Sequence, residues 1–188
     1  MKGNLDEKAE KLEEDKKGFI KQIGLVILVA ILIRAFIFNI TIVSGDSMSP
    51  TLENKDRLLV KKYEAVLKTE DYKRGDVVLF KSPLKDDKRT FIKRVIGLAG
   101  DKINILEGRL FVNDNYMEED YIESGIVTES LLYGEEYIVP ENSIFVLGDN
   151  RLPGASNDSR RFASIPIKSI KGKAVFRIFP FDKFGKEF

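Results

Sequence analysis

The chain has 188 residues, and its 31 Lys and Arg nearly balance its 30 Asp and Glu. This length suits one domain, or one domain with an anchor, and the near-zero net charge gives no reason to expect a nucleic acid partner. Cysteine and histidine are both absent, which excludes disulfides, thiolate chemistry, His-ligated metal sites and the Ser-His-Asp triad. A nucleophile here would need a lysine, a carboxylate or the α-amine as its base.

The first part of the chain predicts a membrane anchor. Residues 1–18 carry mixed charges and predict a solvated cytoplasmic tail, and residues 19–40 read FIKQIGLVILVAILIRAFIFNI. A helix of about 20 largely apolar residues can cross a bilayer. Lysines are concentrated just before the apolar core, and after Arg34 the next basic residue is Lys55. This bias predicts a cytoplasmic N-terminus, with residues 41–188 outside the cytoplasm.

Three other interpretations of residues 19–40 fit less well. A cleavable signal peptide would be followed by an A-x-A-like site, which is absent. A buried core helix would not place Lys21 and Arg34 at its two ends, where they suit membrane interfaces. An interfacial helix would need a polar face, which residues 24–33 lack.

The remaining chain predicts a mainly β domain. Short apolar runs bounded by Gly, Pro, Asn or Asp indicate strands, and EGR and NDN between adjacent runs indicate hairpin turns. The only further helix that the pattern allows lies over residues 63–72. The predicted strands are RLLVKKY (57–63), DVVLFKS (76–82), RTFIKRVIG (89–97), KINIL (102–106), RLFVN (109–113), YIVP (137–140), SIFVLGD (143–149) and KAVFRIFP (173–180).

Three segments hold residues that could perform chemistry. Ser47 lies among Gly, Ser and Pro, in irregular backbone that can expose a hydroxyl, although a simple turn would look the same. On a strand, Lys93 shares a face with Phe91 and Val95, where burial would lower its pKa and let the amine act as a base. Its alternative is a solvated Lys-Arg pair on an edge strand. The third segment, 147–161, could form a polar network or a charged surface loop.

Together these segments resemble the box motifs of bacterial type I signal peptidases, in their single-anchor Gram-positive-like form. SMSPTL (47–52) is similar to the nucleophile motif, and Lys93-Arg94 with Gly97, Gly100 and Asp101 is similar to the base motif. Gly148-Asp149-Asn150 and SNDSR (156–160) are similar to the third motif. KRGDVVLFKSP (73–83) and GKAVFRIFPF (172–181) extend the resemblance, which covers roughly residues 19–181.

The resemblance implies a Ser-Lys dyad with Ser47 as nucleophile and Lys93 as general base. It also implies ion pairs between Arg94 and Asp149 and between Asp158 and Arg160, and a Ser156 hydroxyl that orients the lysine amine. The loop LPGA (152–155) makes the third motif longer than the common form.

Gly45 stands where some members have a serine that donates to the oxyanion. The oxyanion hole would then use the Ser47 amide with other backbone donors or the Ser44 hydroxyl.

The resemblance implies removal of signal peptides from exported preproteins at A-x-A-like sites, with no metal or organic cofactor. Expected partners are signal peptides, the lipid bilayer and the protein export machinery, with the domain anchored in the bacterial cell membrane. An extended peptide could add as a strand beside residues 41–46 or 89–93, where Ile42, Val43, Phe91 and Ile92 either line pockets or belong to the core.

The implied fold consists of antiparallel sheets in a partly barrel-like domain, with a small β extension in 102–142. Two other functions stay open. One is a Ser-Lys protease related to the self-cleaving repressors of the SOS response, which residues 1–40 disfavour. The other is a tethered β domain that binds envelope partners without catalysis.

Overall fold

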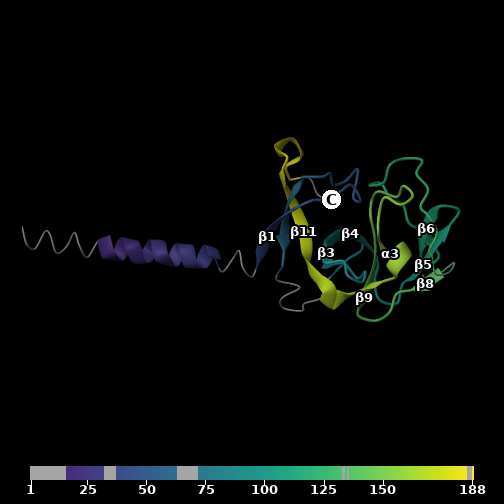
Figure 1. The fold of residues 1–188 in the computed structure, drawn as a ribbon, viewed down its shortest axis with the longest axis horizontal. Helices are drawn as coiled ribbons and strands as arrows, with labels where there is room; N and C mark the ends of the chain where they lie inside the picture. Colours follow the sequence, from purple (N-terminus) through teal and green to yellow (C-terminus); the bar gives the residue numbers. More distant parts are fainter. Residues whose placement is uncertain (1–15, 32–36, 63–71, 133, 135, 186–187) are drawn as a thin grey trace, which may run out of the picture. The chain divides into compact units, whose positions relative to one another are not determined.

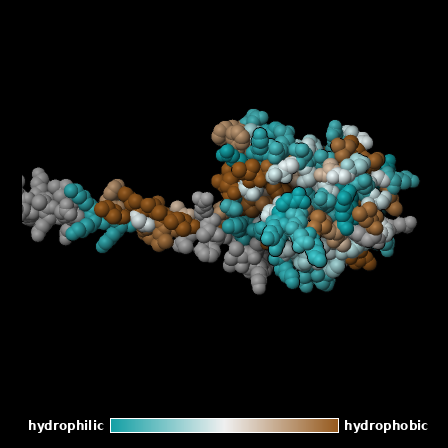
Figure 2. Space-filling model, in the orientation of Figure 1, coloured by the Kyte–Doolittle hydropathy of each residue, from teal (hydrophilic) through white to brown (hydrophobic). Residues whose placement is uncertain are grey.

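The computed structural model describes residues 16–31, 37–62, 72–132, 134, 136–185 and 188. The chain divides into two units, Met1–Ile37 and Phe38–Phe188. In the first unit, residues 16–31 form a helix with exposed side chains, most of them apolar (Figures 1 and 2). Of the helices within the described residues, none combines the length and the apolarity that crossing a membrane requires. The predicted span 19–40 also contains residues 32–36, which lie outside the described ranges.

The end of the predicted anchor needs correction. We expected helix up to Ile40, but strand β1 (Phe38–Ile42) begins at Phe38 and pairs with β2 (Arg57–Lys61). The polar residues Asn39 and Thr41 alternate with apolar neighbours, and this period of two suits a strand. Pairing with RLLVK (57–61) in β2 therefore decides the structure of residues 38–42, although their apolar composition favoured a continued helix.

The larger sheet is antiparallel and open. Its order is β1-β2-β11-β3-β4-β9-β10, so seven strands are joined and the first and last of them do not pair with each other. The predicted mainly antiparallel β fold is thus confirmed, whereas the described strands do not close into a barrel. The additional strands are β3 (Val77–Lys81), β4 (Thr90–Gly97), β9 (Ser143–Leu147), β10 (Ile165–Pro166) and β11 (Ile170–Phe179).

A smaller sheet, in the order β7-β6-β5-β8, lies at the opposite end of this unit from β1 and β11 (Figure 1). It lies within residues 102–142, the range for which a small β extension was predicted. Positive φ angles at Glu107 and Gly108, and at Asn113 and Asp114, form the two tight hairpin turns. Its strands are β5 (Lys102–Leu106), β6 (Arg109–Val112), β7 (Asn115–Tyr116) and β8 (Glu136–Ile138).

The core explains why the central strands read as nearly continuous apolar runs. In β3, Val77 and Leu79 join one buried cluster with Met48, while Val78 and Phe80 join another. Both faces of β3 are therefore covered, which removes the polar alternation of a half-exposed strand. A third cluster joins the two sheets and contains Ile96, Phe145 and Leu147 with Ile103, Ile105, Leu110 and Val112.

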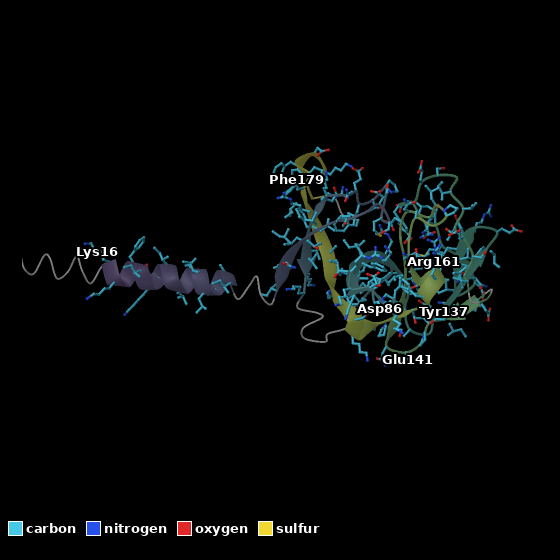
Figure 3. The ribbon with its side chains drawn as sticks, viewed as in Figure 1. Lys16, Asp86, Tyr137, Glu141, Arg161 and Phe179 are labelled. Carbon is cyan, nitrogen blue, oxygen red and sulfur yellow. The ribbon has the colours of Figure 1, made fainter. Side chains whose placement is uncertain are left out.

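The described helices of this unit are short. Helix α3 (Ser159–Phe162) is capped by the Asp158 carboxylate, which accepts a hydrogen bond from the Arg160 amide. Just after α3, Ser164 shares a hydrogen bond of 2.8 Å with the Tyr137 hydroxyl, which ties β8 to the end of α3. Figure 3 labels Tyr137 of β8 and Arg161 of α3. The 3-10 helices are η1 (Ile167–Ser169) and η2 (Phe181–Lys183). Of the helix that the sequence allowed over residues 63–72, residues 63–71 lie outside the described ranges.

Candidate active site

The fold brings Ser47 and Lys93 together across 46 residues of sequence. Ser47 lies in the turn that follows β1, and Lys93 lies in β4. The lysine Nζ is 2.6 Å from Ser47 Oγ and donates a second hydrogen bond of 2.9 Å to the Ile92 carbonyl. Lys93 is only 2% exposed, so the alternative of a solvated edge-strand lysine is wrong.

The surroundings of Lys93 favour its neutral form. Burial lowers the pKa of the Lys93 amine from 10.5 to about 8, because a charged ammonium loses its hydration there. The carboxylates of Asp158 and Asp149 oppose this change, and the Arg160 guanidinium adds to it. A large fraction of the amine is therefore neutral at mildly alkaline pH and can accept a proton from a neighbouring hydroxyl.

Arg94, next to the lysine, is anchored in the opposite direction. Its Nε and Nη2 bind the two oxygens of Asp149 at 2.9 and 2.6 Å, and Nη1 donates to the Gly75 carbonyl at 2.9 Å. Both members of this ion pair are almost fully buried. A bidentate buried pair fixes the orientation of a strand more firmly than a single contact does.

The second expected ion pair joins Asp158 and Arg160 at the start of α3. Arg160 donates to Asp158 through Nε at 2.9 Å and Nη2 at 2.8 Å, and the Gly148 amide donates to the same carboxylate. Burial alone would raise the pKa of Asp158, but these hydrogen bonds and the guanidinium charge hold it below its ordinary value. Asp158 therefore stays ionised, and its charge faces the lysine.

The segment 148–150 supports the backbone of Ser47. The Asn150 amide donates to the Ser47 carbonyl at 3.2 Å, and the Asn150 side chain donates to the Asp46 carbonyl at 3.0 Å. The buried Ser156 hydroxyl makes no hydrogen bond to the Lys93 amine in this structure, so the expected contact is not formed. The hydroxyl lies instead beside Asp158 and helps to lower the pKa of that carboxyl. Ser156 also packs against Gly148.

Gly148 is expected to tolerate no side chain. A Cβ at this position would lie 2.4 Å from both the Ser47 carbonyl oxygen and Ser156 Oγ. We expect Gly148→Ala to displace Ser47 and lower kcat for peptide cleavage about 100-fold, since a shift of about 1 Å can cost that much. Gly24→Ala is the matched control, because nothing lies within 4 Å of that position. Unchanged kcat in Gly148→Ala would show that the loop adapts freely.

An open groove runs past the serine and the lysine. It encloses a cavity of about 420 Å³ between residues 41–48 on one side and residues 89–93 on the other. The candidate substrate residues Ile42, Val43, Phe91 and Ile92 all line it, as do Ser44 and Gly45. Val43 is only 3% exposed and packs in the core, whereas Ile42 is 60% exposed. Thr41, Arg89 and Thr90, which also line the groove, fall within the two ranges predicted to flank a substrate strand, whereas Leu79, Ala155 and Asn157 were not predicted.

The backbone of Ser47 itself offers a candidate donor to an oxyanion. The Ser47 amide makes no hydrogen bond to any other described residue. The Gly45 amide, by contrast, donates to the Asn54 side chain at 3.2 Å. Gly45 has φ +89°, a conformation that side-chain-bearing residues rarely adopt, so the backbone itself accounts for glycine at this position.

Several residues that support the site were given no individual role from the sequence. Asn150 and Arg151 lie in the segment 147–161, for which a polar network was one of the two interpretations. The ring of Tyr121 lies over the Arg94 guanidinium. Arg151 donates to the Gly148 carbonyl and to the Glu119 carboxylate. No pattern in the sequence marks Glu119 or Tyr121, because their partners are distant in sequence.

A buried amine beside a serine hydroxyl, next to an open groove, defines the class of site found in serine hydrolases that lack histidine. Comparison with known proteins agrees: the family model for signal peptidase, peptidase S26, matches residues 16–179. The chain belongs to this family and is a serine peptidase, a hydrolase.

Named relatives span nearly the whole chain. Signal peptidase I of Bacillus caldolyticus is 35% identical over 186 residues, covering 94% of this chain and 98% of the relative. Signal peptidase I of Leptolyngbya laminosa is 38% identical over 173 residues, covering 89% and 81%. The crystal structure of a signal peptidase I from Enterococcus faecalis is 29% identical, covers 56% of this chain and 98% of that one, and has a TM-score of 0.48.

Proposed function

We propose that this protein is a membrane-bound endopeptidase that removes N-terminal signal peptides from exported preproteins with a Ser47–Lys93 dyad. The observation that carries the proposal is the 2.6 Å contact between Lys93 Nζ and Ser47 Oγ, with the lysine buried. The relatives named signal peptidase I support the choice of substrate.

The geometry supports acyl transfer. Neutral Lys93 accepts the proton of Ser47 Oγ, and the oxygen attacks the scissile carbonyl carbon. The Ser47 amide, with the Ser44 hydroxyl as a second candidate donor, stabilises the oxyanion. The lysine ammonium then gives its proton to the leaving amine, and an ester to Ser47 remains. Lys93 then takes a proton from a water molecule that attacks the ester and gives it to the departing Ser47 oxygen, which releases the new acid and restores the serine and the neutral amine.

The supporting residues keep the dyad aligned. Arg94 with Asp149 holds β4, and Asp158 with Arg160 holds the start of α3 beside the amine. We assign to Ser156 the role of a second hydroxyl that orients the amine during the reaction, since its buried hydroxyl lies beside Asp158, whose carboxylate faces the lysine. No step requires a metal or an organic cofactor.

Two unpaired strand edges suit an extended peptide. In β4, residues 90–93 pair with β3, whereas pairing with β9 starts only at Arg94. β1 pairs with β2 and is an end strand of the larger sheet, so its other edge is the second. A peptide that adds as a strand between these edges would present alternate side chains to the groove. Ile42 and Phe91 are the side chains that we expect to limit the size of substrate residues near the cut.

We place the protein in the bacterial cell membrane, with residues 19–37 as its anchor. Residues 16–31 are helical, and apolar side chains such as Leu25, Val26 and Ile31 are more than half exposed. Such surface needs an apolar environment. A single pass with a cytoplasmic N-terminus would hold residues 38–188 on the outer side, where the export machinery delivers preproteins.

The test is cleavage of a preprotein with an A-x-A site by the full chain in detergent. We expect Ser47→Ala and Lys93→Ala each to lower kcat at least 1,000-fold while the fold is retained, as removal of a nucleophile or its base does elsewhere. Circular dichroism checks the fold of each variant. Unchanged cleavage in either variant would refute the dyad. If the wild-type protein cuts no such preprotein, a tethered binding domain becomes the better interpretation.

A further inference from the structure

A network of charged and aromatic side chains lies behind the dyad. The ring of Tyr121 lies over the Arg94 guanidinium, with 4.0 Å from the ring centroid to Cζ. The Tyr121 hydroxyl donates a hydrogen bond of 2.6 Å to the Glu119 carboxylate. The same carboxylate accepts hydrogen bonds from both terminal nitrogens of Arg151. Both residues belong to the segment between β7 and β8, far from the box motifs in sequence.

The other end of this network reaches the loop that holds the nucleophile. Arg151 Nε donates to the Gly148 carbonyl at 2.8 Å, and its Nη1 donates to Thr128 at 2.9 Å. The neighbouring Asn150 amide binds the Ser47 carbonyl. The Tyr121 carbonyl also accepts a bond from Thr51, in the nucleophile motif. Tyr121 therefore contacts Arg94, the residue next to Lys93. Glu119 contacts Arg151, the residue next to the Asn150 that binds Ser47.

The charges in this network are matched. Arg94 and Arg151 are 2% and 1% exposed, and they face Asp149 and Glu119 respectively. Burial and the nearby Glu119 carboxylate raise the pKa of the Tyr121 hydroxyl, so the ring stays neutral. With both guanidinium groups paired, the ring excludes water from one face of Arg94. Such a satisfied buried network allows few alternative arrangements.

We propose that Glu119 and Tyr121 are positioning residues for catalysis, which clamp Arg94 and Arg151 and thereby align Lys93 with Ser47. The inference rests on the proposed dyad. Neither residue touches the reacting atoms; Tyr121 acts through Arg94 on β4, and Glu119 acts through Arg151 on the 148–151 loop.

The clamp also controls the field at the lysine. Lys93 faces Asp149, Asp158 and Arg160, while Arg94 neutralises Asp149. If the ring over Arg94 is lost, the guanidinium can move away from Asp149, whose negative charge then favours the charged form of Lys93 more strongly. The pKa of Lys93 should rise, and activity that depends on the neutral amine should need a higher pH.

The experiment compares pH profiles of kcat/KM for preprotein cleavage by the full chain. In Tyr121→Leu we expect the acid limb to move to higher pH by about one unit, which lowers activity at neutral pH about tenfold. Tyr121→Phe keeps the ring over Arg94, so its pH profile should lie between those of the wild type and Tyr121→Leu. Tyr116→Leu, at an exposed tyrosine in β7, should match the wild type.

The outcomes separate this inference from the proposed function. Activity in Lys93→Ala would overturn the dyad itself. If Lys93→Ala is inactive but the acid limb of the pH profile does not move in Tyr121→Leu, the dyad stands and the positioning role of Tyr121 is overturned. An equal fall in activity at every pH would count as this outcome, because loss of folded protein also produces it. If Tyr121→Leu does not fold, Glu119→Gln is measured instead, and the same upward shift is expected because the tyrosine loses its charged anchor.

Discussion

Replacing Lys93 with methionine is expected to abolish cleavage and to make the protein more stable at neutral pH. Methionine fills a similar volume without a charge, and the lysine ammonium is buried at a cost. One pKa unit corresponds to about 1.4 kcal/mol, so a fall from 10.5 to about 8 sets an upper bound of about 3 kcal/mol on the gain in the free energy of unfolding. Stability is given up here for a reactive base.

The gain should depend on pH with a definite sign. Between about 8 and 10.5 the unfolded wild-type chain holds a proton on Lys93 that the folded chain has lost, so wild-type stability rises with pH in that window. Below it both states are protonated, and the full penalty remains. The advantage of Lys93→Met should therefore be greatest below pH 8 and should shrink as the pH approaches 10.5.

Chemical denaturation at several pH values, by circular dichroism, measures this difference. Lys81→Met is the matched control, because Lys81 is exposed at the end of β3 and should show no pH-dependent gain. A variant that is less stable than the wild type at pH 7 would contradict the buried ammonium. A gain that stays constant up to pH 10.5 would assign the effect to packing instead.

Replacing Arg94 with leucine is expected to destabilise the domain by about 3 to 5 kcal/mol, because Asp149 would be left as an uncompensated buried charge. Asp149 is 1% exposed and receives two hydrogen bonds from Arg94. The double variant Arg94→Leu/Asp149→Leu removes both charges and should recover much of this loss. Cleavage should stay low in both variants, since β4 and the 148–151 loop are no longer tied together.

Arg89 provides the comparison for this pair. It also binds an aspartate, Asp87, through two nitrogens, but the Arg89 side chain is 71% exposed. Water screens that pair, so Arg89→Leu should change the free energy of unfolding little. Equal losses in Arg94→Leu and Arg89→Leu, measured by urea denaturation, would mean that burial does not determine the strength of the Arg94 contact.

The sequence by itself predicted the two residues of the proposed dyad and most of the strands. The absence of histidine left lysine as a candidate base, and resemblance to the signal peptidase motifs singled out Ser47 and Lys93, which the fold brings within 2.6 Å. Apart from the two-residue strands β7 and β10, the strands from β2 onward were predicted, because Gly, Pro, Asn and Asp mark their turns. The resemblance to the family motifs also implied two ion pairs, and the structure contains both. They join Arg94 to Asp149 and Arg160 to Asp158.

Only the tertiary structure decided the features that depend on long-range packing. Strand β1 follows from pairing with β2, which an apolar run resembling a helix does not reveal. The burial of both Lys93 and Arg94 requires the two faces of β4 to be covered, whereas local sequence equally allowed a solvated edge. Glu119 and Tyr121 reach Arg151 and Arg94 only because the small sheet packs against the large one through Ile103 and Phe145. Local patterns record which face of a strand is apolar, but the partner that covers that face is set by the whole chain.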